Sequence, residues 1–390
     1  MNVPKLRFKE FTDKWQKVPL NLFTNIYGGY AFKSENLLNY KAKYQVIKMG
    51  NVNNNTLNLE KNPSYLNTIS QKELPYLLEK NDIILTLTGT FGKKDFGYSY
   101  QIKNETNLLL NQRLAVFKIT NSNYSANFLK YILLNNTFLN KFFRFSVGGT
   151  GNQANVSIQD IKSFKIPFPK LEEQNKIANF LTTVDKKITN LENTIISLEN
   201  QKKGLLQQIF SQKLRFKDKN GNNYPNWEKK KLGDILKICH GKDYKNEPNE
   251  KKLYPVLGTG GIITYIDNFL CNWKCVLIGR KGTINKPQYM ETPFWSVDTL
   301  FYSKPKTKQN PKFQYYLFQN INWIKYDEST GVPSLSASTI ENISFVLPCL
   351  EEQTKIADFL SAFDRKLDNQ KAQLEHWKQI KKGLLQQMFV

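Results

Sequence analysis

The chain is poor in several residues that commonly carry chemistry. Its 390 residues include four cysteines, two histidines, six arginines and only 33 acidic residues. With two histidines and no recognisable pair of base and nucleophile, the sequence offers no catalytic constellation. The cysteines all fall in the second half of the chain, unlike a secreted disulfide scaffold, so we expect reduced thiols at these positions: Cys239, Cys271, Cys275 and Cys349.

Long apolar runs are also missing. No stretch approaches the roughly 18 apolar residues that a membrane-spanning helix needs, and we therefore expect a cytoplasmic protein. Hydrophobic residues nevertheless make up 40% of the chain and aromatic residues 13%, enough to bury substantial cores in two or three domains. The 56 Lys+Arg give a formal net charge of +23. Such a charge on a folded surface favours a polyanionic partner, either nucleic acid or an anionic membrane.

A long segment of the sequence occurs twice. Residues from Leu171 read LEEQNKIANFLTTVDKKI and end in KKGLLQQIF, and residues from Leu350 read LEEQTKIADFLSAFDRKL and end in KKGLLQQMF, at a constant offset of 179 positions. A shorter repeat, Leu-Arg-Phe-Lys followed by a tryptophan, occurs at 6–15 and again at 214–227. The chain therefore alternates two globular regions with two copies of a helical segment.

Both copies carry apolar residues at alternating steps of four and three, which is typical of coiled-coil helices. Lys202 interrupts the pattern in the first copy, and Gln370 and Lys381 interrupt it in the second. Because the helices are equally long, we expect them to pair with each other in antiparallel fashion. The predicted seam consists of Ile177, Leu181, Val184, Ile188, Leu191, Ile195 and Leu198 in the first copy, and Ile356, Leu360, Phe363, Leu367, Leu374 and Trp377 in the second.

A glycine lies late in each predicted helix, at Gly204 and Gly383. A glycine inside a helix costs about 1 kcal/mol relative to alanine. Its presence in both copies indicates a close backbone approach, or else shared ancestry without present use.

The two globular regions share weaker landmarks in the same order. DIILTLTG at 82–89 corresponds to CVLIGRKG at 275–282, and residues 149–157 correspond to 330–336. Such β-rich runs between Gly and Asn turns predict strands, and we expect helices near 127–143 and 311–319. Each region is thus predicted to be a mixed α and β module.

These features resemble the specificity (S) subunits of type I restriction-modification systems. The residues that carry the resemblance are Pro169-Lys-Leu-Glu-Glu-Gln174 with Ile177, Pro348-Cys-Leu-Glu-Glu-Gln353 with Ile356, the Gly89-Thr90 and Gly282-Thr283 turns, and Gly151-Asn-Gln-Ala-Asn-Val-Ser157. The second half has Val-Pro-Ser-Leu in place of the Gln and Asn of the last motif. The resemblance implies an α+β chain with a pseudo-two-fold internal repeat: target-recognition domains at 1–165 and 211–345, and spacer helices at 166–210 and 346–390 that pair as an antiparallel coiled coil.

The same resemblance implies a non-catalytic subunit that reads a bipartite double-stranded DNA target, with the helices setting the gap between its halves. A helix of about 35 residues spans roughly 50 Å, compatible with two readers about one turn of DNA, roughly 34 Å, apart. Two adenine-N6 methyltransferase subunits would dock on the chain, and two restriction subunits are left open. S-adenosylmethionine, ATP and Mg would be bound by these partners, with no cofactor or metal on this chain.

Three local patterns suggest chemistry of other kinds. The glycine-rich run at 256–261 is similar to a cofactor loop, but no helix-forming run follows it. Asn62-Pro-Ser-Tyr65 is one proline short of the amino-methyltransferase motif Asn-Pro-Pro-Tyr, and we interpret it as a turn. Cys239, His240, Cys271 and Cys275 could ligate zinc, but their spacing is not that of a zinc knuckle, which favours buried thiols.

Candidate DNA contacts are cationic and polar side chains near Gly turns, where a side chain can reach phosphate or a base edge. For each of them the alternative is an ordinary solvated surface residue. Two other functions stay open at this point: a stand-alone DNA methyltransferase or nuclease, and a non-specific nucleic-acid-binding coiled-coil protein. The candidates are Lys93, Lys94, Arg113, Arg144, Gln153 and Asn155 in the first module, and Lys242, Lys245, Tyr265, Arg280, Lys281 and Lys286 in the second.

Overall fold

The computed structural model describes residues 3–148 and 152–390, so Gly149, Thr150 and Gly151 of the glycine motif lie outside the described residues. The chain divides into two compact units. Unit 1 comprises Met1–Asn190 with Leu374–Val390, and unit 2 comprises Leu191–Gln373. Each unit therefore contains one globular module together with one end of each long helix, α4 (Leu171–Phe210) and α8 (Leu350–Gln387).

The described part of the unit 1 module is built from short sheets, three short α-helices and several 3₁₀ turns. Its sheets have the strand orders β2-β11-β7-β9, β10-β3-β6, β12-β13-β8, β1-β14 and β4-β5. The elements are β1 (Gln16–Pro19), β2 (Thr24–Gly28), β3 (Tyr44–Ile47), β4 (Val52–Asn53), β5 (Thr56–Leu57), β6 (Tyr65–Leu66), β7 (Ile83–Thr86), β8 (Thr88–Thr90), β9 (Ser99–Gln101), β10 (Leu108–Leu110), β11 (Leu114–Ile119), α1 (Ala126–Leu133), α2 (Asn136–Arg144), β12 (Val147–Gly148), β13 (Gln153–Asn155), α3 (Ile158–Lys162) and β14 (Lys165–Phe168).

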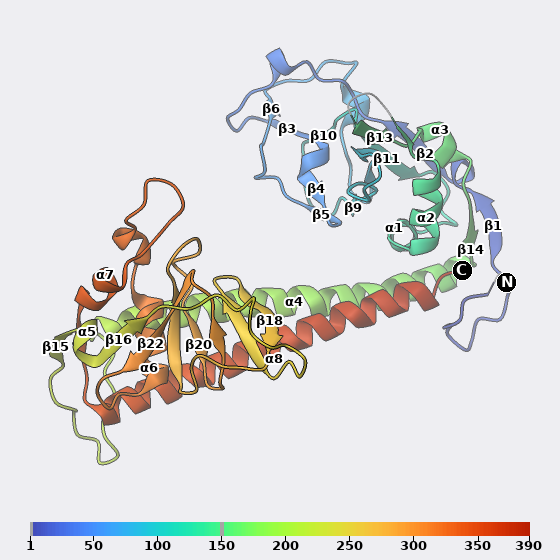
Figure 1. The fold of residues 1–390 in the computed structure, drawn as a ribbon. Coiled ribbons are helices and arrows are strands. Elements are labelled where there is room, and N and C mark those ends of the chain that lie inside the picture. Colours follow the sequence, from blue (N-terminus) through green and yellow to red (C-terminus); the bar gives the residue numbers. More distant parts are fainter. Residues whose placement is uncertain (1–2, 149–151) are drawn as a thin grey trace. The chain divides into compact units, whose positions relative to one another are not determined.

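The module of unit 2 has the strand orders β16-β22-β19-β20, β18-β17-β21 and β15-β23, with α6 packed against β19 and β20 (Figure 1). Its elements are β15 (Glu228–Lys231), α5 (Leu232–Ile235), β16 (Leu236–Cys239), β17 (Tyr254–Gly258), β18 (Gly261–Ile266), β19 (Cys275–Gly279), β20 (Gln288–Met290), β21 (Trp295–Ser296), β22 (Leu300–Pro305), α6 (Pro311–Asn320), α7 (Ala337–Asn342) and β23 (Ser344–Leu347).

The two modules share one topology. The antiparallel sheet β2-β11-β7-β9 of unit 1 corresponds to β16-β22-β19-β20 of unit 2, and the parallel pair β3-β10 corresponds to β17-β21. In both modules the strand that follows the N-terminal segment pairs with the strand that leads into the long helix, as β1-β14 and β15-β23. The predicted α+β fold with an internal repeat is therefore confirmed.

The predicted helix near 127–143 is wrong in one respect, because the structure has two helices there. The first helix ends at Leu133 and Asn135 caps the second, its side chain accepting a hydrogen bond from the N–H of Thr137. The same amide donates to the carbonyl of Leu385 at the end of α8. The break thus allows one asparagine to start α2 and to hold the end of α8 in unit 1.

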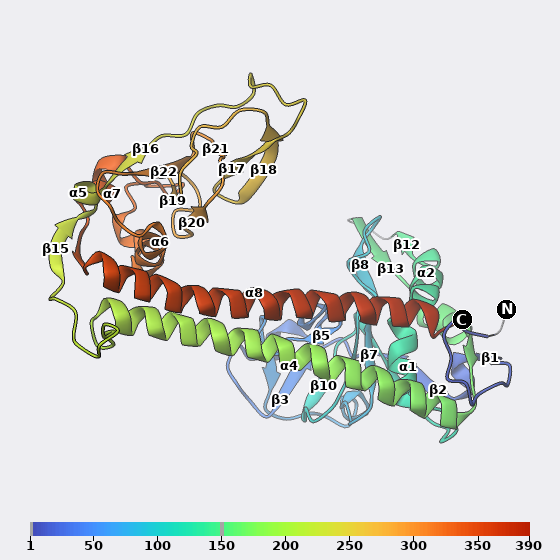
Figure 2. The same cartoon turned by 90° about the horizontal axis from the view of Figure 1, so that it is seen from below.

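The long helices pack together and run antiparallel (Figure 1, Figure 2). Two ion pairs in unit 2 show the direction: Glu199 pairs with Lys371 at 2.7 Å, and Lys202 pairs with Asp364 at 2.5 Å. Moving forward along α4 therefore means moving backward along α8. The seven predicted seam side chains of α4 are all buried. On α8 the burial is less complete. Ile356, Leu360 and Leu367 are buried, whereas Phe363, Leu374 and Trp377 are partly exposed.

The prediction of a close backbone approach at the two helix glycines is wrong. A Cβ atom placed on Gly204 or Gly383 would meet no atom within 4 Å outside its own stretch of helix. Of the two interpretations, shared ancestry remains.

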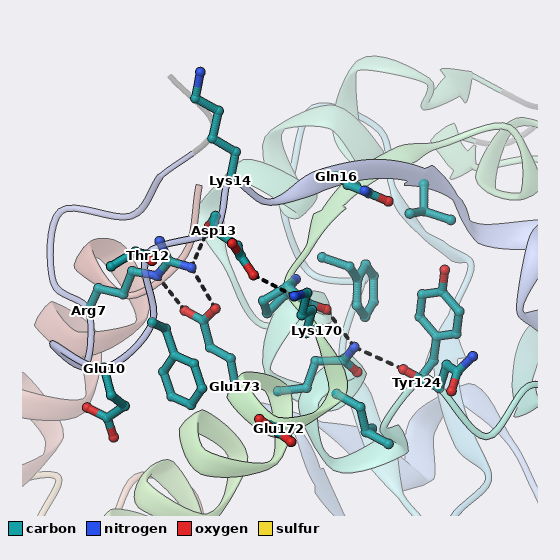
Figure 3. Close-up of a pocket in the computed structure, with 17 residues that line it drawn as sticks. Arg7, Glu10, Thr12, Asp13, Lys14, Gln16, Tyr124, Lys170, Glu172 and Glu173 are labelled. Carbon is teal, nitrogen blue, oxygen red and sulfur yellow. Dashed lines mark hydrogen bonds and ion pairs between the residues drawn. The ribbon is translucent and has the colours of Figure 1, made fainter.

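The second glutamate of the pair that opens each long helix has a defined structural role. In unit 1, Glu173 accepts two hydrogen bonds of 2.7 Å from the guanidinium of Arg7 (Figure 3). It also accepts one of 3.2 Å from the indole of Trp15. In unit 2, Glu352 accepts the same set from Arg215, at 3.0 and 2.8 Å, and from Trp227 at 2.9 Å. The short Leu-Arg-Phe-Lys repeat is therefore the partner of the LEEQ repeat, and each glutamate raises the pKa of its arginine through these hydrogen bonds.

The lysines that interrupt the seam belong to a second repeated cluster. Lys381 lies 2.7 Å from Asp185, which also accepts a 2.8 Å hydrogen bond from Tyr131 of α1. In unit 2 the corresponding contacts join Lys202 to Asp364 at 2.5 Å and Tyr316 of α6 to Asp364 at 2.6 Å. Each cluster therefore joins both long helices to the module that they carry.

Asp185 predicts a specific dependence of stability on pH. Burial raises its pKa, but Lys381, Tyr131 and Lys130 outweigh burial and hold the pKa below the ordinary value of 3.8. The Tyr131 hydroxyl that bonds Asp185 is also hydrogen-bonded to the hydroxyl of Thr182. Since a lowered folded-state pKa contributes stability that is lost as the pH falls through that pKa, the free energy of unfolding should drop on acidification below about pH 4. Urea denaturation from pH 6 to pH 2.5 should show a smaller drop for Lys381→Met, and equal drops would contradict the assignment.

Candidate nucleic-acid interface

A shallow, open pocket of about 380 Å³ lies at the strand ends of the unit 1 module. Its polar lining residues include Thr88, Gln112, Arg113, Asn155 and Gln159. Backbone pairing brings three segments together here: the N–H of Leu87 donates to the carbonyl of Arg113 at 3.1 Å, and Thr88 pairs with Asn155 across β8 and β13. Two of the candidate DNA contacts, Arg113 and Asn155, thus line one pocket.

The turn that carries Arg113 packs closely against the backbone of Gly29. Gly29 lies directly under it, and a Cβ atom at that position would come within 2.3 Å of the Asn111 carbonyl oxygen. Gly241 occupies the corresponding place in unit 2, where a Cβ atom would lie 2.0 Å from the Val297 carbonyl oxygen. Both turns therefore require glycine beneath them, and the side chains that they carry are presented on a fixed backbone.

The corresponding surface of unit 2 is formed by the same strand ends. Arg280 and Lys281 follow β19, and both of their N–H groups donate to the carbonyl of Thr299. Lys281 also pairs with Ser334 in a β-bridge, and the N–H of Leu335 donates to the Arg280 carbonyl at 2.9 Å. Arg280 and Lys281 are both exposed.

Lys93 and Lys94 lie in the middle of the connection from β7 to β9, the counterpart of the connection from β19 to β20 that Arg280 and Lys281 begin in unit 2. Lys93 follows a turn closed by its N–H and the Thr90 carbonyl, and the ammonium of Lys94 lies 5.6 Å from the centre of the Phe143 ring. Lys286 is exposed near the end of the shorter connection in unit 2.

The remaining candidates are placed singly. Gln153 is exposed on β13 opposite Thr90, and Arg144 is the exposed last residue of α2. In unit 2 the N–H of Lys242 donates to the Ser296 carbonyl, at the base of the turn that carries Thr299. Lys245 is exposed in the loop after it, and Tyr265 is 42% exposed on the edge strand β18.

Sequence reasoning missed several polar residues on this surface. Thr88, Gln112 and Gln159 line the unit 1 pocket, and Ser334 borders Lys281 in unit 2. Gln112 and Ser334 were within reach of a sequence argument, because they lie inside segments that correspond between the modules: 110–114 with 296–300, and 149–157 with 330–336. Gln159 is on α3, and no signal in the sequence connects it to the strand ends.

The patterns that suggested other chemistry take ordinary structural positions. The glycine-rich run at 256–261 forms the turn of the β17-β18 hairpin, and Asn62 adopts a positive φ of 46° shortly before β6. The sulfur atoms of Cys271 and Cys275 lie 3.7 Å apart in the core of unit 2. Among residues 3–148 and 152–390, no group of three or more His, Cys, Asp or Glu side chains is arranged to hold a metal ion.

Comparison with known proteins identifies the family. A family model described as the type I restriction modification DNA specificity domain matches residues 12–200 and 224–376. The chain belongs to this family. Its two matched regions each contain one module with part of a long helix, as the repeat in the sequence requires.

Relatives of the type I specificity family align over most of the chain. The specificity subunit of the type I restriction enzyme MjaVIII from Methanocaldococcus jannaschii is 26% identical over 358 residues, covering 81% of this chain and 80% of the relative. The crystal structure of a type I restriction-modification S subunit from M. genitalium has a TM-score of 0.65 at 20% identity, covering 100% of this chain and 99% of that one. A third similar protein comes from a structural study of complex assembly and conformational transition in the type I R-M system. It has a TM-score of 0.56 at 14% identity, and the match covers 95% of this chain and 96% of that one.

As for a membrane, the described part of this specificity-family chain contains no helix that is both long and apolar enough to span one.

Proposed function

We propose that this chain is the DNA sequence-specificity subunit of a type I restriction-modification complex. Each module reads one half of a bipartite double-stranded target, and the paired helices set the gap between the halves. The observation that carries this proposal is a contrast within the repeat. The contacts that attach each module to the helices recur at equivalent residues, whereas the strand ends on the exposed surface carry different side chains. A scaffold that presents two different readers has this pattern.

The electrostatics of the chain support a DNA partner. The net charge of +23 favours a polyanion, and exposed cations gather at the strand ends of both modules, at Arg113 in unit 1 and at Arg280 and Lys281 in unit 2. Polar side chains that can reach base edges stand beside them, including Asn155 and Ser334. Phosphate contacts from the lysines would position the duplex, and the strand-end side chains would read it.

The chain itself carries out no chemistry in this proposal. It binds no cofactor, and two adenine-N6 methyltransferase subunits dock on it and bring S-adenosylmethionine. ATP and Mg belong to restriction subunits, where these join the complex. The chain's own contribution is to bind, orient and space the DNA.

Selection from a pool of random duplexes tests this function. The full chain in complex with its modification subunit should enrich two short specified sequences separated by a fixed unspecified gap. The modification subunit alone is the control and should enrich none. A complex that binds all duplexes equally at physiological salt would contradict specificity and would favour the non-specific binder.

A further inference from the structure

Arginine is rare in this chain, and its placement in the two units is informative. The six arginines are Arg7, Arg113, Arg144, Arg215, Arg280 and Arg365. Arg7 and Arg215 hold the carboxylates that open the long helices. Arg113 and Arg280 instead are exposed at the strand ends of the two modules, on the surface described above.

These two arginines lie next to paired strand ends that correspond between the modules. Arg113 is the residue before β11, and Arg280 is the residue after β19. In unit 1 the register pairs Thr86 with Leu114, and in unit 2 it pairs Gly279 with Leu300. The residue after the first strand therefore corresponds between the units, Leu87 with Arg280, and so does the residue before the second strand, Arg113 with Thr299.

One backbone hydrogen bond joins the two positions in each unit. The N–H of Leu87 donates to the carbonyl of Arg113 at 3.1 Å, and the N–H of Arg280 donates to the carbonyl of Thr299 at 2.8 Å. Each module thus has one arginine in this hydrogen-bonded pair. In unit 1 the arginine adjoins β11, and in unit 2 it adjoins β19, which pairs with β22, the counterpart of β11.

The third segment at this site is also equivalent. The N–H of Val156 donates to the Leu87 carbonyl at 3.1 Å, and the N–H of Leu335 donates to the Arg280 carbonyl at 2.9 Å. Asn155, the residue before Val156, pairs with Thr88, and Ser334, the residue before Leu335, pairs with Lys281. A short polar side chain therefore flanks the arginine in both modules.

An arginine suits this position in a way that the many lysines do not. The guanidinium presents N–H groups in a rigid planar fork that matches O6 and N7 of guanine in the major groove, whereas the lysine ammonium sits on a flexible stem and is less pre-organised for this contact. In unit 2, among the residues that the structure describes, the guanidinium of Arg280 donates one weak hydrogen bond, from Nη1 to the Asp298 carbonyl at 3.4 Å. In unit 1 the Arg113 side chain lines the open pocket with Thr88 and Asn155.

We propose that Arg113 and Arg280 are the equivalent guanine-reading residues of the two modules, and that each half of the DNA target contains a G·C pair read by one of them. This inference rests on the proposed function. It adds a base identity for each half-site and assigns it to a named side chain.

The test uses the same duplex selection with the full chain in its complex. Arg113→Gln should shift one guanine position in one half-site to adenine, because glutamine pairs with adenine, with a change of roughly 5- to 100-fold in discrimination. Arg280→Gln should do the same in the other half-site only. Each variant loses one positive charge, so affinity for non-specific DNA should fall by a similar amount in both.

Arg365→Gln is the matched control, since it makes the same change at an exposed arginine on α8, away from the strand ends, and it should leave the motif unaltered. If wild type selects a split motif that Arg113→Gln and Arg280→Gln both leave intact, the inference is overturned and the proposed function stands. The same holds if both variants alter the same half-site. If wild type selects no motif, the proposed function itself fails.

Discussion

Replacing Glu352 with alanine should lower the free energy of unfolding by about 3–5 kcal/mol, the usual cost of removing one partner from a buried ion pair. The Glu352 side chain is fully buried, and its carboxylate accepts hydrogen bonds from Arg215 and from the Trp227 indole. Without it, the indole N–H loses its acceptor at the start of α8, and the guanidinium loses its carboxylate partner and keeps the carbonyls of Tyr224 and Pro225. Urea denaturation followed by circular dichroism measures the loss.

The neighbouring residue supplies the control for this prediction. Glu351 lies in the same first turn of α8 but is exposed. Glu351→Ala removes the same charge from the helix N-terminus, which costs about 0.3–1 kcal/mol. Glu352→Gln should fall between the two alanine variants, because an amide oxygen still accepts one hydrogen bond. Equal losses for Glu351→Ala and Glu352→Ala would refute the role of the buried carboxylate.

Reversing the charge of Lys202 should have the second large effect. Lys202→Asp would place two carboxylates together in unit 2, where Lys202 and Asp364 now form an ion pair with both side chains largely buried. A polar residue in a coiled-coil seam specifies the register of the helices. We therefore expect Lys202→Asp to lower stability and to broaden the range of gap lengths between the half-sites that the complex selects.

The double variant Lys202→Asp with Asp364→Lys should recover part of the stability and the single gap. The two residues should show a coupling energy of about 0.5–3 kcal/mol in a double-mutant cycle. Lys203→Asp is the control, because Lys203 is adjacent on α4 but exposed. A single unchanged gap in Lys202→Asp would show that the ion pair does not set the register.

The helical part of the fold could be predicted from the sequence because its signal is local and repeated. The constant offset between Leu171 and Leu350 and the alternating apolar steps identify two long helices without any tertiary information. The sequence also marked Lys202 and Lys381 as interruptions. Their ion-pair role was not predictable from the sequence, because each lysine pairs with an aspartate on the other long helix. The tyrosines that contact these aspartates lie in the diverged modules, and the spacing between the two tyrosines differs from the 179-residue offset of the helices.

The surface of the modules was predictable only as a set of candidates. Aligning the two halves by sequence places Arg113 opposite Thr299 and Arg280 opposite Leu87, so neither arginine has a counterpart. Within each unit, Leu87 lies beside Arg113 and Arg280 lies beside Thr299 because β7 pairs with β11 and β19 pairs with β22, which no local pattern encodes. The two helices at 126–144 show the same limit, since the break at Asn135 depends on a contact with Leu385 at the other end of the chain.

Methylome sequencing tests the central claim most directly. DNA would be compared between cells that express the modification subunit with this chain and cells that express the modification subunit alone. The account predicts N6-methyladenine at a split motif only when this chain is present, and replacing residues 1–165 with the corresponding module of a relative should change one half of that motif and leave the other half intact. A stable complex that methylates no motif, or a replacement that changes both halves, would contradict it.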